Sequence, residues 1–276
     1  MNLFVPIGPF SLPLNALLVM IAAVLGSWIA ARHAKRLGIS SEGAVWLALA
    51  SGLVAARLGF VFNYADVYLA EPLSLLDIRD GGWNAWWGLA TVWACTLLII
   101  HRRPALRQPM LKGISTFSLI LLLSIALNAL PTSANRPLPN LPVTALNGDS
   151  VRLPDFAGKP TVINLWASWC PPCRREMPVF EQAQAEREDM HFVFLNQGED
   201  GATVQDFLRD TGLVLDNVLL DRMADMGQSL GQRGLPVTLF FNAEGNLEDI
   251  RLGELSRGSL AQRLDALTPE LLSEEK

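Results

Sequence analysis

Four long apolar runs in the first half of the chain limit what this sequence can fold into. They cover residues 12–31, 43–62, 84–101 and 114–130. A transmembrane helix needs about 20 mostly apolar residues, which each run approaches or reaches. We therefore expect an all-α transmembrane domain of four helices over residues 1–131, a proline-rich linker over residues 132–142 and a second domain over residues 143–276.

The distribution of basic residues orients the four helices. Seven Lys or Arg residues lie in the loops after the first and third runs: Arg32, Lys35, Arg36, Arg102, Arg103, Arg107 and Lys112. The opposite side carries one, Arg79. Loops rich in Lys and Arg stay in the cytoplasm, so the N-terminus and the second domain are expected outside it. A cleaved signal peptide, the other reading of the first run, would carry its positive charges before the apolar core rather than after it.

A charged residue, Arg57, interrupts the second run near its outer end. Two readings are open. The side chain either extends along the helix to reach water, or it pairs with Asp77, Asp80 or a lipid headgroup, because charges inside membranes are often functional.

The residues around Arg57 also carry a resemblance. Residues 56–62, Asp80-Gly81-Gly82 and Gly88-Leu89 resemble the N-terminal half of prolipoprotein diacylglyceryl transferase. That family has His-Gly-Gly where this sequence has Trp86-Trp87-Gly88, and its later helices have no counterpart here. The resemblance implies a truncated relative that serves as an anchor or a lipid-contacting platform, without transferase activity.

The second part of the chain differs in charge and in pattern. Residues 132–276 carry thirteen Lys or Arg against twenty-two Asp or Glu, which argues against nucleic acid as a partner because phosphates need clustered basic residues. Short apolar runs alternate with amphipathic segments, which predicts an α/β domain with a mixed sheet flanked by helices. The expected strands are Val143–Ala145, Val151–Leu153, Thr161–Trp166, His191–Leu195, Val218–Leu220 and Val237–Phe241, and the expected helices cover residues 172–187, 202–211, 222–231 and 258–272.

A pair of cysteines directly follows one of these strands. Cys170-Pro171-Pro172-Cys173 lies between the strand and a predicted helix. At a helix N-terminus, unpaired backbone N–H groups and the helix dipole stabilise a thiolate and lower the pKa of the thiol. Cys170 is therefore the expected nucleophile toward a disulfide, and Cys173 the residue that resolves the mixed disulfide. The two prolines suit a helix start, where a missing N–H matters least.

Zinc binding and a structural disulfide are the alternative readings of this pair. Tetrahedral zinc needs four ligands, usually a second Cys-x-x-Cys or a pair of histidines. Neither is present, because the three histidines, His33, His101 and His191, are far apart in sequence. We expect no metal and no cofactor. Cys95 lies in an apolar run and is expected to be a buried apolar residue.

The cysteine segment carries a second resemblance. Residues 166–178, with the sequence WASWCPPCRREMP, resemble the active-site segment of the TlpA/ResA branch of thioredoxin-like proteins. The resemblance covers about residues 137–270 and implies a thioredoxin fold. It also implies a cis peptide bond before Pro236, which would face the cysteines. Leu235 would then offer its backbone to an extended substrate chain, beside Pro171 and Pro172.

Two neighbours of the cysteines have a functional and a structural reading. Glu176 lies three positions after Cys173, one helical turn away. Its position in the family implies a proton acceptor or pKa modulator for Cys173, whereas the structural reading is a first-turn glutamate that complements the helix dipole. Trp169 either shields the site as part of the substrate surface or is a packed aromatic residue.

Both resemblances, together with the charge bias, imply a multi-pass protein of a bacterial inner membrane with its N-terminus and thioredoxin-like domain in the periplasm. We expect a protein-disulfide reductase that acts on envelope proteins, with cytochrome c maturation as one candidate process and membrane lipid around the first domain. A separate membrane thiol reductase would supply electrons, because Cys95 alone cannot form a dithiol. Sequence does not determine the reduction potential, so an oxidase or isomerase stays open. The third hypothesis is a lipid-handling or envelope-sensing membrane protein whose cysteine pair only reports redox state.

Overall fold

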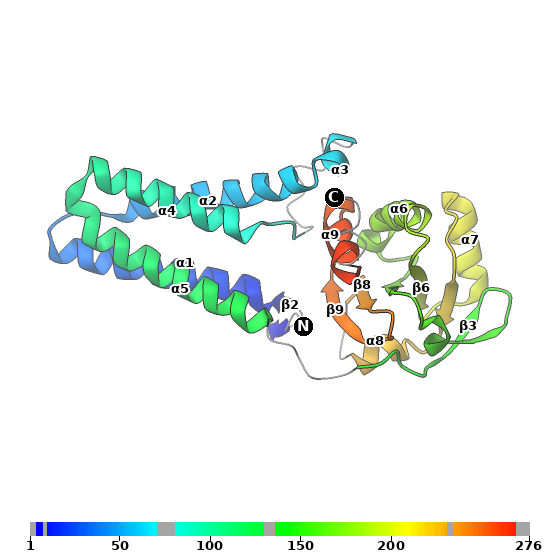
Figure 1. Cartoon of the computed structure of the whole chain (residues 1–276). Coiled ribbons are helices and arrows are strands. Elements are labelled where there is room, and N and C mark those ends of the chain that lie inside the picture. Colours follow the sequence, from blue (N-terminus) through cyan, green and yellow to red (C-terminus); the bar gives the residue numbers. More distant parts are fainter. Residues whose placement is uncertain (1–3, 8–9, 71–80, 130–135, 231–233, 269–276) are drawn as a thin grey trace. The chain divides into compact units, whose positions relative to one another are not determined.

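The computed structural model describes residues 4–7, 10–70, 81–129, 136–230 and 234–268. The chain divides into two compact units. One consists of Asn2–Leu75 and Gly82–Pro131, and the other is made mainly of Thr132–Lys276. Figure 1 shows the helices of the first unit in blue to green and the sheet of the second in green to red.

The first unit is helical apart from a short hairpin. Its helices are α1 (Leu14–Arg36), α2 (Glu42–Asn63), α3 (Ala65–Ala70), α4 (Ala85–Arg102), η3 (Pro104–Leu106) and α5 (Arg107–Ala129). Strands β1 (Phe4–Ile7) and β2 (Phe10–Pro13) form an antiparallel hairpin before α1. The expectation of an all-α first domain is therefore corrected at its N-terminus, where the short segment before the first apolar run pairs with itself.

Helices occur at all four predicted crossings, but three of them have the length and apolarity of a membrane span. These are the segments Ala16–Arg36, Glu42–Asn63 and Pro104–Leu127. The fourth, α4, has 18 residues and ends in His101 and Arg102, which reduces its apolar length. Among the described helices, three of the four predicted crossings thus have the length and composition that a membrane span requires.

Glycines bring the helices of this unit into close contact in two pairs. Helix α1 packs on α5, where a Cβ added to Gly113 would lie 2.6 Å from the Gly26 carbonyl oxygen. Helix α2 packs on α4, where a Cβ added to Gly52 would lie 2.9 Å from the Gly88 carbonyl oxygen. Small residues that let backbones approach are typical of helix contacts in membranes. Helix α4 is therefore an integral part of the helical unit, although it is not among the three segments with the length and apolarity of a membrane span.

Arg57 lies inside this unit. Only 8% of its surface is exposed, and its Nη1 donates a hydrogen bond to the Gly82 carbonyl oxygen at 2.9 Å. The guanidinium lies 5.4 Å from the ring centroid of Tyr68 and 5.9 Å from that of Phe60. The reading in which Arg57 extends to water is therefore wrong. Its proposed partners Asp77 and Asp80 lie outside the described residues.

The second unit contains a seven-stranded mixed sheet in the order β4-β3-β7-β6-β5-β8-β9. The central strands β5, β6 and β7 are parallel, and the outer pairings are antiparallel. The strands are β3 (Pro142–Ala145), β4 (Ser150–Arg152), β5 (Thr161–Trp166), β6 (His191–Gln197), β7 (Val218–Asp221), β8 (Val237–Phe241) and β9 (Leu247–Leu252). All six named strand predictions and the mixed character of the sheet are confirmed.

Helices cover both faces of the sheet (Figure 1). Side chains alternate along a strand, so neighbours on β5 point to opposite faces. Val162 belongs to the core under α6 (Pro171–Glu186), α7 (Gly201–Thr211) and α9 (Arg257–Leu267). Ile163 belongs to the core on the other face, with η4 (Leu153–Phe156) and α8 (Asp225–Ser229). Residues buried on both faces make β5 a rigid support for the segment that follows it.

Part of the predicted linker packs on this second unit. Leu138 is buried, and its backbone N–H donates to the Gly245 carbonyl oxygen at 2.9 Å. The N–H of Leu247 donates to the Arg136 carbonyl oxygen at 2.9 Å. Residues 136–142 are thus attached to the sheet domain, whereas residues 130–135 lie outside the described residues.

Candidate active site

The strand directions bring four connecting segments to one edge of the sheet. Because β5, β6 and β7 are parallel, the segments after Trp166, Gln197 and Asp221 leave the sheet at the same edge. Strand β8 is antiparallel to β5, so the segment before Val237 enters at that edge. Ligands of open α/β sheets bind at such carboxyl ends, because loops and helix N-termini converge there.

The two cysteines form a disulfide at this edge. Cys170 is the N-cap residue of α6, and Cys173 lies in its first turn. The Cys173 backbone N–H donates to the Cys170 sulfur at 3.3 Å. Cys170 is 3% exposed and Cys173 is fully buried. The helix N-terminus would stabilise a thiolate on the more accessible Cys170 once the bond is reduced.

The residues predicted to meet a substrate differ in exposure. Trp169 is 67% exposed and is therefore not a packed aromatic residue. Pro171 is exposed, while Pro172 and Leu235 are half-buried. The peptide bond between Leu235 and Pro236 is cis, as the resemblance implied. The predicted residues lie on the segments that reach the cysteine edge of the sheet.

Glu176 is fully buried, one turn along α6 from Cys173. Asn164 Nδ2 donates to its Oε1 at 2.9 Å, and the Leu255 backbone N–H donates to its Oε2 at 3.0 Å. Burial raises the pKa of Glu176 to about 8, although the hydrogen bonds from Asn164 and Leu255 lower it. An exposed first-turn glutamate would show none of this, so the structural reading based on the helix dipole does not account for the residue.

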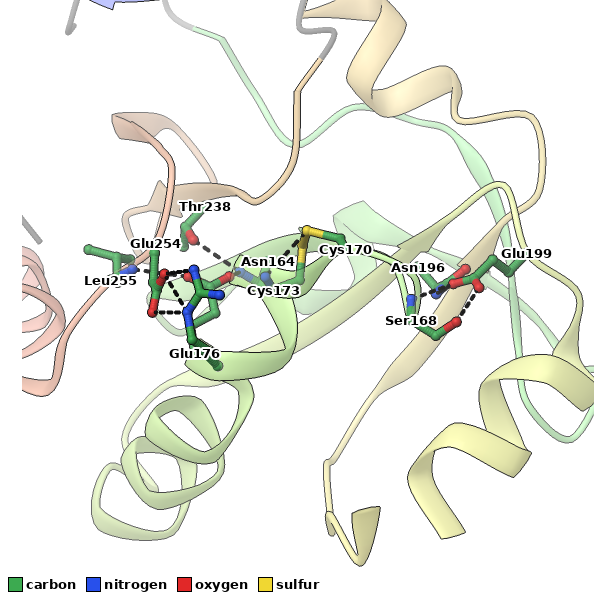
Figure 2. The surroundings of a disulfide bond; sticks show 11 residues. Asn164, Ser168, Cys170, Cys173, Glu176, Asn196, Glu199, Thr238, Glu254 and Leu255 are labelled. Atoms are coloured by element: carbon green, nitrogen blue, oxygen red, sulfur yellow. Dashed lines mark hydrogen bonds and ion pairs between the residues drawn. A yellow bond between two sulfur atoms is a disulfide. The ribbon is translucent and has the colours of Figure 1, made fainter. Parts of the chain in front are cut away.

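A second carboxylate, that of Glu199, organises the turn before Cys170 and is not among the residues predicted from the sequence. Glu199 Oε2 accepts hydrogen bonds from the Ser168 backbone N–H at 2.7 Å and from Asn196 Nδ2 at 2.6 Å. Glu199 Oε1 accepts from the Ser168 hydroxyl. In Figure 2 the disulfide lies between this network and the one around Glu176. The available signal was a polar side chain, Asn164 or Asn196, within each of two buried strands.

Arg175 and Glu254 connect α6 to the segment after β9. The Arg175 guanidinium binds the Glu254 carboxylate through Nε, at 3.1 Å to each oxygen, and through Nη2 at 2.6 Å. Leu255, which donates to Glu176, follows Glu254 directly. The ion pair therefore helps to hold the backbone donor of the buried acid in place.

A mixed sheet of this topology, with a Cys-x-x-Cys disulfide at the start of α6 and a cis-proline before β8, defines a thioredoxin-like thiol-disulfide oxidoreductase. Comparison with known proteins gives the same class. Residues 130–266 match the Redoxin family. Residues 2–128 match the prolipoprotein diacylglyceryl transferase family.

Individual relatives cover the second unit. Thiol-disulfide oxidoreductase ResA of Halalkalibacterium halodurans is 29% identical over 133 residues, which are 48% of this chain and 75% of ResA. Thioredoxin-like protein YneN of Bacillus subtilis is 30% identical over 131 residues, which are 46% of this chain and 76% of YneN. A solved structure of MTB dsbF in its mixed oxidized and reduced forms is 26% identical with a TM-score of 0.43, covering 47% of this chain and 96% of that one. The chain belongs to the thioredoxin-like thiol-disulfide oxidoreductases and carries a membrane-protein unit before the redox domain.

Proposed function

We propose that the protein is a membrane-anchored protein-disulfide reductase whose reduced Cys170–Cys173 pair acts on envelope proteins. The observation that carries this proposal is the buried Glu176, one helical turn from Cys173, with a pKa of about 8. A proton acceptor works best when its pKa lies near the working pH. The name of the ResA relatives supports disulfide chemistry of this type.

The proposed reaction transfers two electrons from the dithiol to the substrate. The Cys170 thiolate attacks a substrate disulfide, and the first substrate sulfur leaves as a thiolate that takes a proton from water. Cys173 then passes its proton to the ionised Glu176 and attacks Cys170 in the mixed disulfide. The second substrate thiolate leaves, and the Cys170–Cys173 disulfide remains.

Glu176 serves the return step in its protonated form. A membrane thiol reductase attacks the disulfide, and Cys173 leaves first as a thiolate in this scheme. Glu176 returns its proton to that thiolate, so the acid is ionised again for the next substrate. A carboxyl with a pKa of about 8 is available in both protonation states near neutral pH.

The direction of the reaction is tested by the reduction potential of the pair. We would equilibrate the full-length protein in detergent with thiol buffers and measure the oxidised fraction. A value near about −270 mV, as in thioredoxin, supports a reductase, whereas a value near about −120 mV, as in a strong oxidant, contradicts it.

Substrates are tested by trapping. Cys173→Ser leaves the nucleophile but prevents resolution, so mixed disulfides through Cys170 should accumulate in cells. Cys170→Ser is the matched control and should trap far fewer proteins. Equal trapping by both variants would contradict the assigned roles.

We further propose that the protein resides in a bacterial inner membrane with the redox domain in the periplasm. Basic residues flanking α1 and α4 support this orientation. The proposal requires α4 to cross the bilayer as a fourth span. Single cysteines at Ser40 and Glu244, both exposed, would test it with a membrane-impermeant thiol reagent. Glu244→Cys should react in intact cells and Ser40→Cys only after permeabilisation; the reverse pattern would overturn the orientation.

A lipid-handling role for the first unit is a second candidate, favoured by the match of residues 2–128 to prolipoprotein diacylglyceryl transferase. The aligned His-Gly-Gly of that family is Trp86-Trp87-Gly88 here, which argues against the transfer reaction itself. Replacement of residues 1–131 by an unrelated four-span anchor would separate anchoring from a specific role. Full reductase function after the exchange would exclude a specific role in that function.

A further inference from the structure

Asn164 lies at the centre of the buried network beside the disulfide. It is on β5, which carries no other amide side chain, and it is 1% exposed. Its Nδ2 donates to Glu176 Oε1 at 2.9 Å and to the Thr238 hydroxyl oxygen at 3.1 Å. Figure 2 shows Asn164 between these two partners, which come from α6 and β8. One amide group therefore connects three elements around the cysteines.

The carbonyl oxygen of the same amide, Asn164 Oδ1, is buried and has no hydrogen-bond partner among the described residues. A buried acceptor without a hydrogen bond costs free energy and needs a reason. If the amide were flipped, its carbonyl oxygen would face a carboxylate oxygen of Glu176. Both of its N–H groups would then lack a hydrogen-bond acceptor. The observed orientation thus stabilises the ionised form of Glu176.

We propose that Asn164 and Thr238 are positioning residues that set the proton affinity of Glu176: the Asn164 amide donates to Oε1, and the Thr238 hydroxyl holds the amide in that orientation. The inference rests on the proposed role of Glu176 as the proton acceptor for Cys173. It goes further by placing the control of that role on β5 and β8, outside the helix that carries the cysteines and the acid.

Two charged side chains also act on Glu176. Glu254 raises its pKa, and Arg251 on β9 lowers it. Glu254 also forms an ion pair with Arg175. Leu255 supplies a backbone donor to Oε2. After burial, which raises the pKa, the hydrogen bond from Asn164 has the largest effect on this carboxyl. Among these side chains, substitution of Asn164 should therefore change the pKa of Glu176 most.

Thr238 gives the proposal a nearly isosteric test. Thr238→Val keeps the shape and removes the hydroxyl, which leaves one Asn164 N–H unpaired and the amide free to reorient. Thr238→Ser keeps the hydroxyl and is the matched control. Asn164→Leu keeps the approximate size of the side chain and removes the donor without adding an ionisable group, so it should have the larger effect.

The measurement is the titration of Glu176 by ¹³C NMR of glutamate carboxyl groups in the full-length, oxidised protein in detergent, where the disulfide cysteines do not titrate. Glu176→Gln identifies the resonance. Loss of a hydrogen bond to a charged group should raise the midpoint by about one to two pH units in Asn164→Leu. Thr238→Val should raise it by a smaller amount, and Thr238→Ser should leave it unchanged.

Two failures can be told apart. If Asn164→Leu and Thr238→Val titrate like the unmodified protein, the positioning role is wrong, whatever Glu176 does. If the midpoint shifts as expected but Glu176→Gln leaves the pH profile of disulfide exchange unchanged, the positioning role stands and the proposed proton transfer fails. Should Asn164→Leu not fold, as judged by its thermal melt, Thr238→Val against Thr238→Ser decides the question.

Discussion

At the scale of single residues, two carboxylates have opposite environments and opposite uses. Glu176 is buried among donors from the protein interior, and its pKa is raised to about 8 by that burial. Glu199 is half-exposed and ties Ser168 and Asn196 together by hydrogen bonds. The first fits a role in proton transfer, and the second fits a role in holding the turn that carries Trp169 and Cys170.

Removal of the Glu199 carboxylate should therefore loosen this turn. Glu199→Ala removes the acceptor for Ser168 and Asn196, and hydrogen bonds to charged groups contribute about 1.5–3 kcal/mol each when buried, less when half-exposed. We expect the free energy of unfolding to fall by about 2 kcal/mol, measured by urea denaturation of the full-length protein. Glu244→Ala, at an exposed position in a turn, is the control and should change little. Equal effects of the two substitutions would show that Glu199 has no special role.

At the scale of elements, the two units use different packing. The redox domain relies on β5, which is buried on both faces and leads directly into the N-terminus of α6. The helical unit relies on glycines at which α1 meets α5 and α2 meets α4.

A methyl group at such a glycine should separate the helices. Gly113→Ala places a Cβ 2.6 Å from the Gly26 carbonyl oxygen and 2.8 Å from the Ala30 Cβ, closer than atoms tolerate. We expect a loss of roughly 1–3 kcal/mol, as for other overpacked sites, seen as a lower melting temperature of the full-length protein in detergent. Gly43→Ala is the matched control, since a Cβ there meets nothing within 4 Å and alanine favours the helix. A melting temperature for Gly113→Ala equal to that of the control would refute close packing of α1 on α5.

At the scale of the whole molecule, the buried acid links stability to pH. The pKa of Glu176 is raised from 4.5 to about 8, so the folded state holds a proton that the unfolded state has released between these values. The contribution of Glu176 to the free energy of unfolding is fully present below the pKa of the unfolded state. It is lost as the pH rises toward the pKa of the folded state. Across this range the free energy of unfolding falls by roughly 3–5 kcal/mol.

Glu176→Gln should remove this pH dependence, because glutamine does not ionise. We expect the unmodified protein to lose stability between pH 5 and about 8 in urea denaturation, and the variant to lose much less over the same range. At pH 9 the variant should be the more stable of the two. Parallel curves for both proteins would mean that Glu176 is ionised at neutral pH and that its burial has little consequence.

Much of the molecule follows from local patterns in the sequence. The apolar runs predict the four long helices of the first unit, and alternation in residues 143–276 predicts the strands, because burial of one or both faces imposes a period on the chain. The cysteine pair at a helix start predicts which side chains react. Local patterns did not predict two further features, the hairpin at residues 4–13 and the packing of residues 136–142 on the sheet. Both depend on contacts with partner segments that are not encoded in a local pattern.

Tertiary structure alone decided the environment of the reactive groups. Glu176 is one glutamate among many in the sequence, and its pKa depends on burial and on donors from β5 and from Leu255, 79 positions away. Asn164 and Thr238 meet across 74 positions only because β5 and β8 pair in register. Arg57 likewise packs inside its unit through Gly82, 25 positions away. Sequence determined the class of chemistry through residues adjacent in the chain, whereas proton affinity depends on charges and dipoles that only folding brings together.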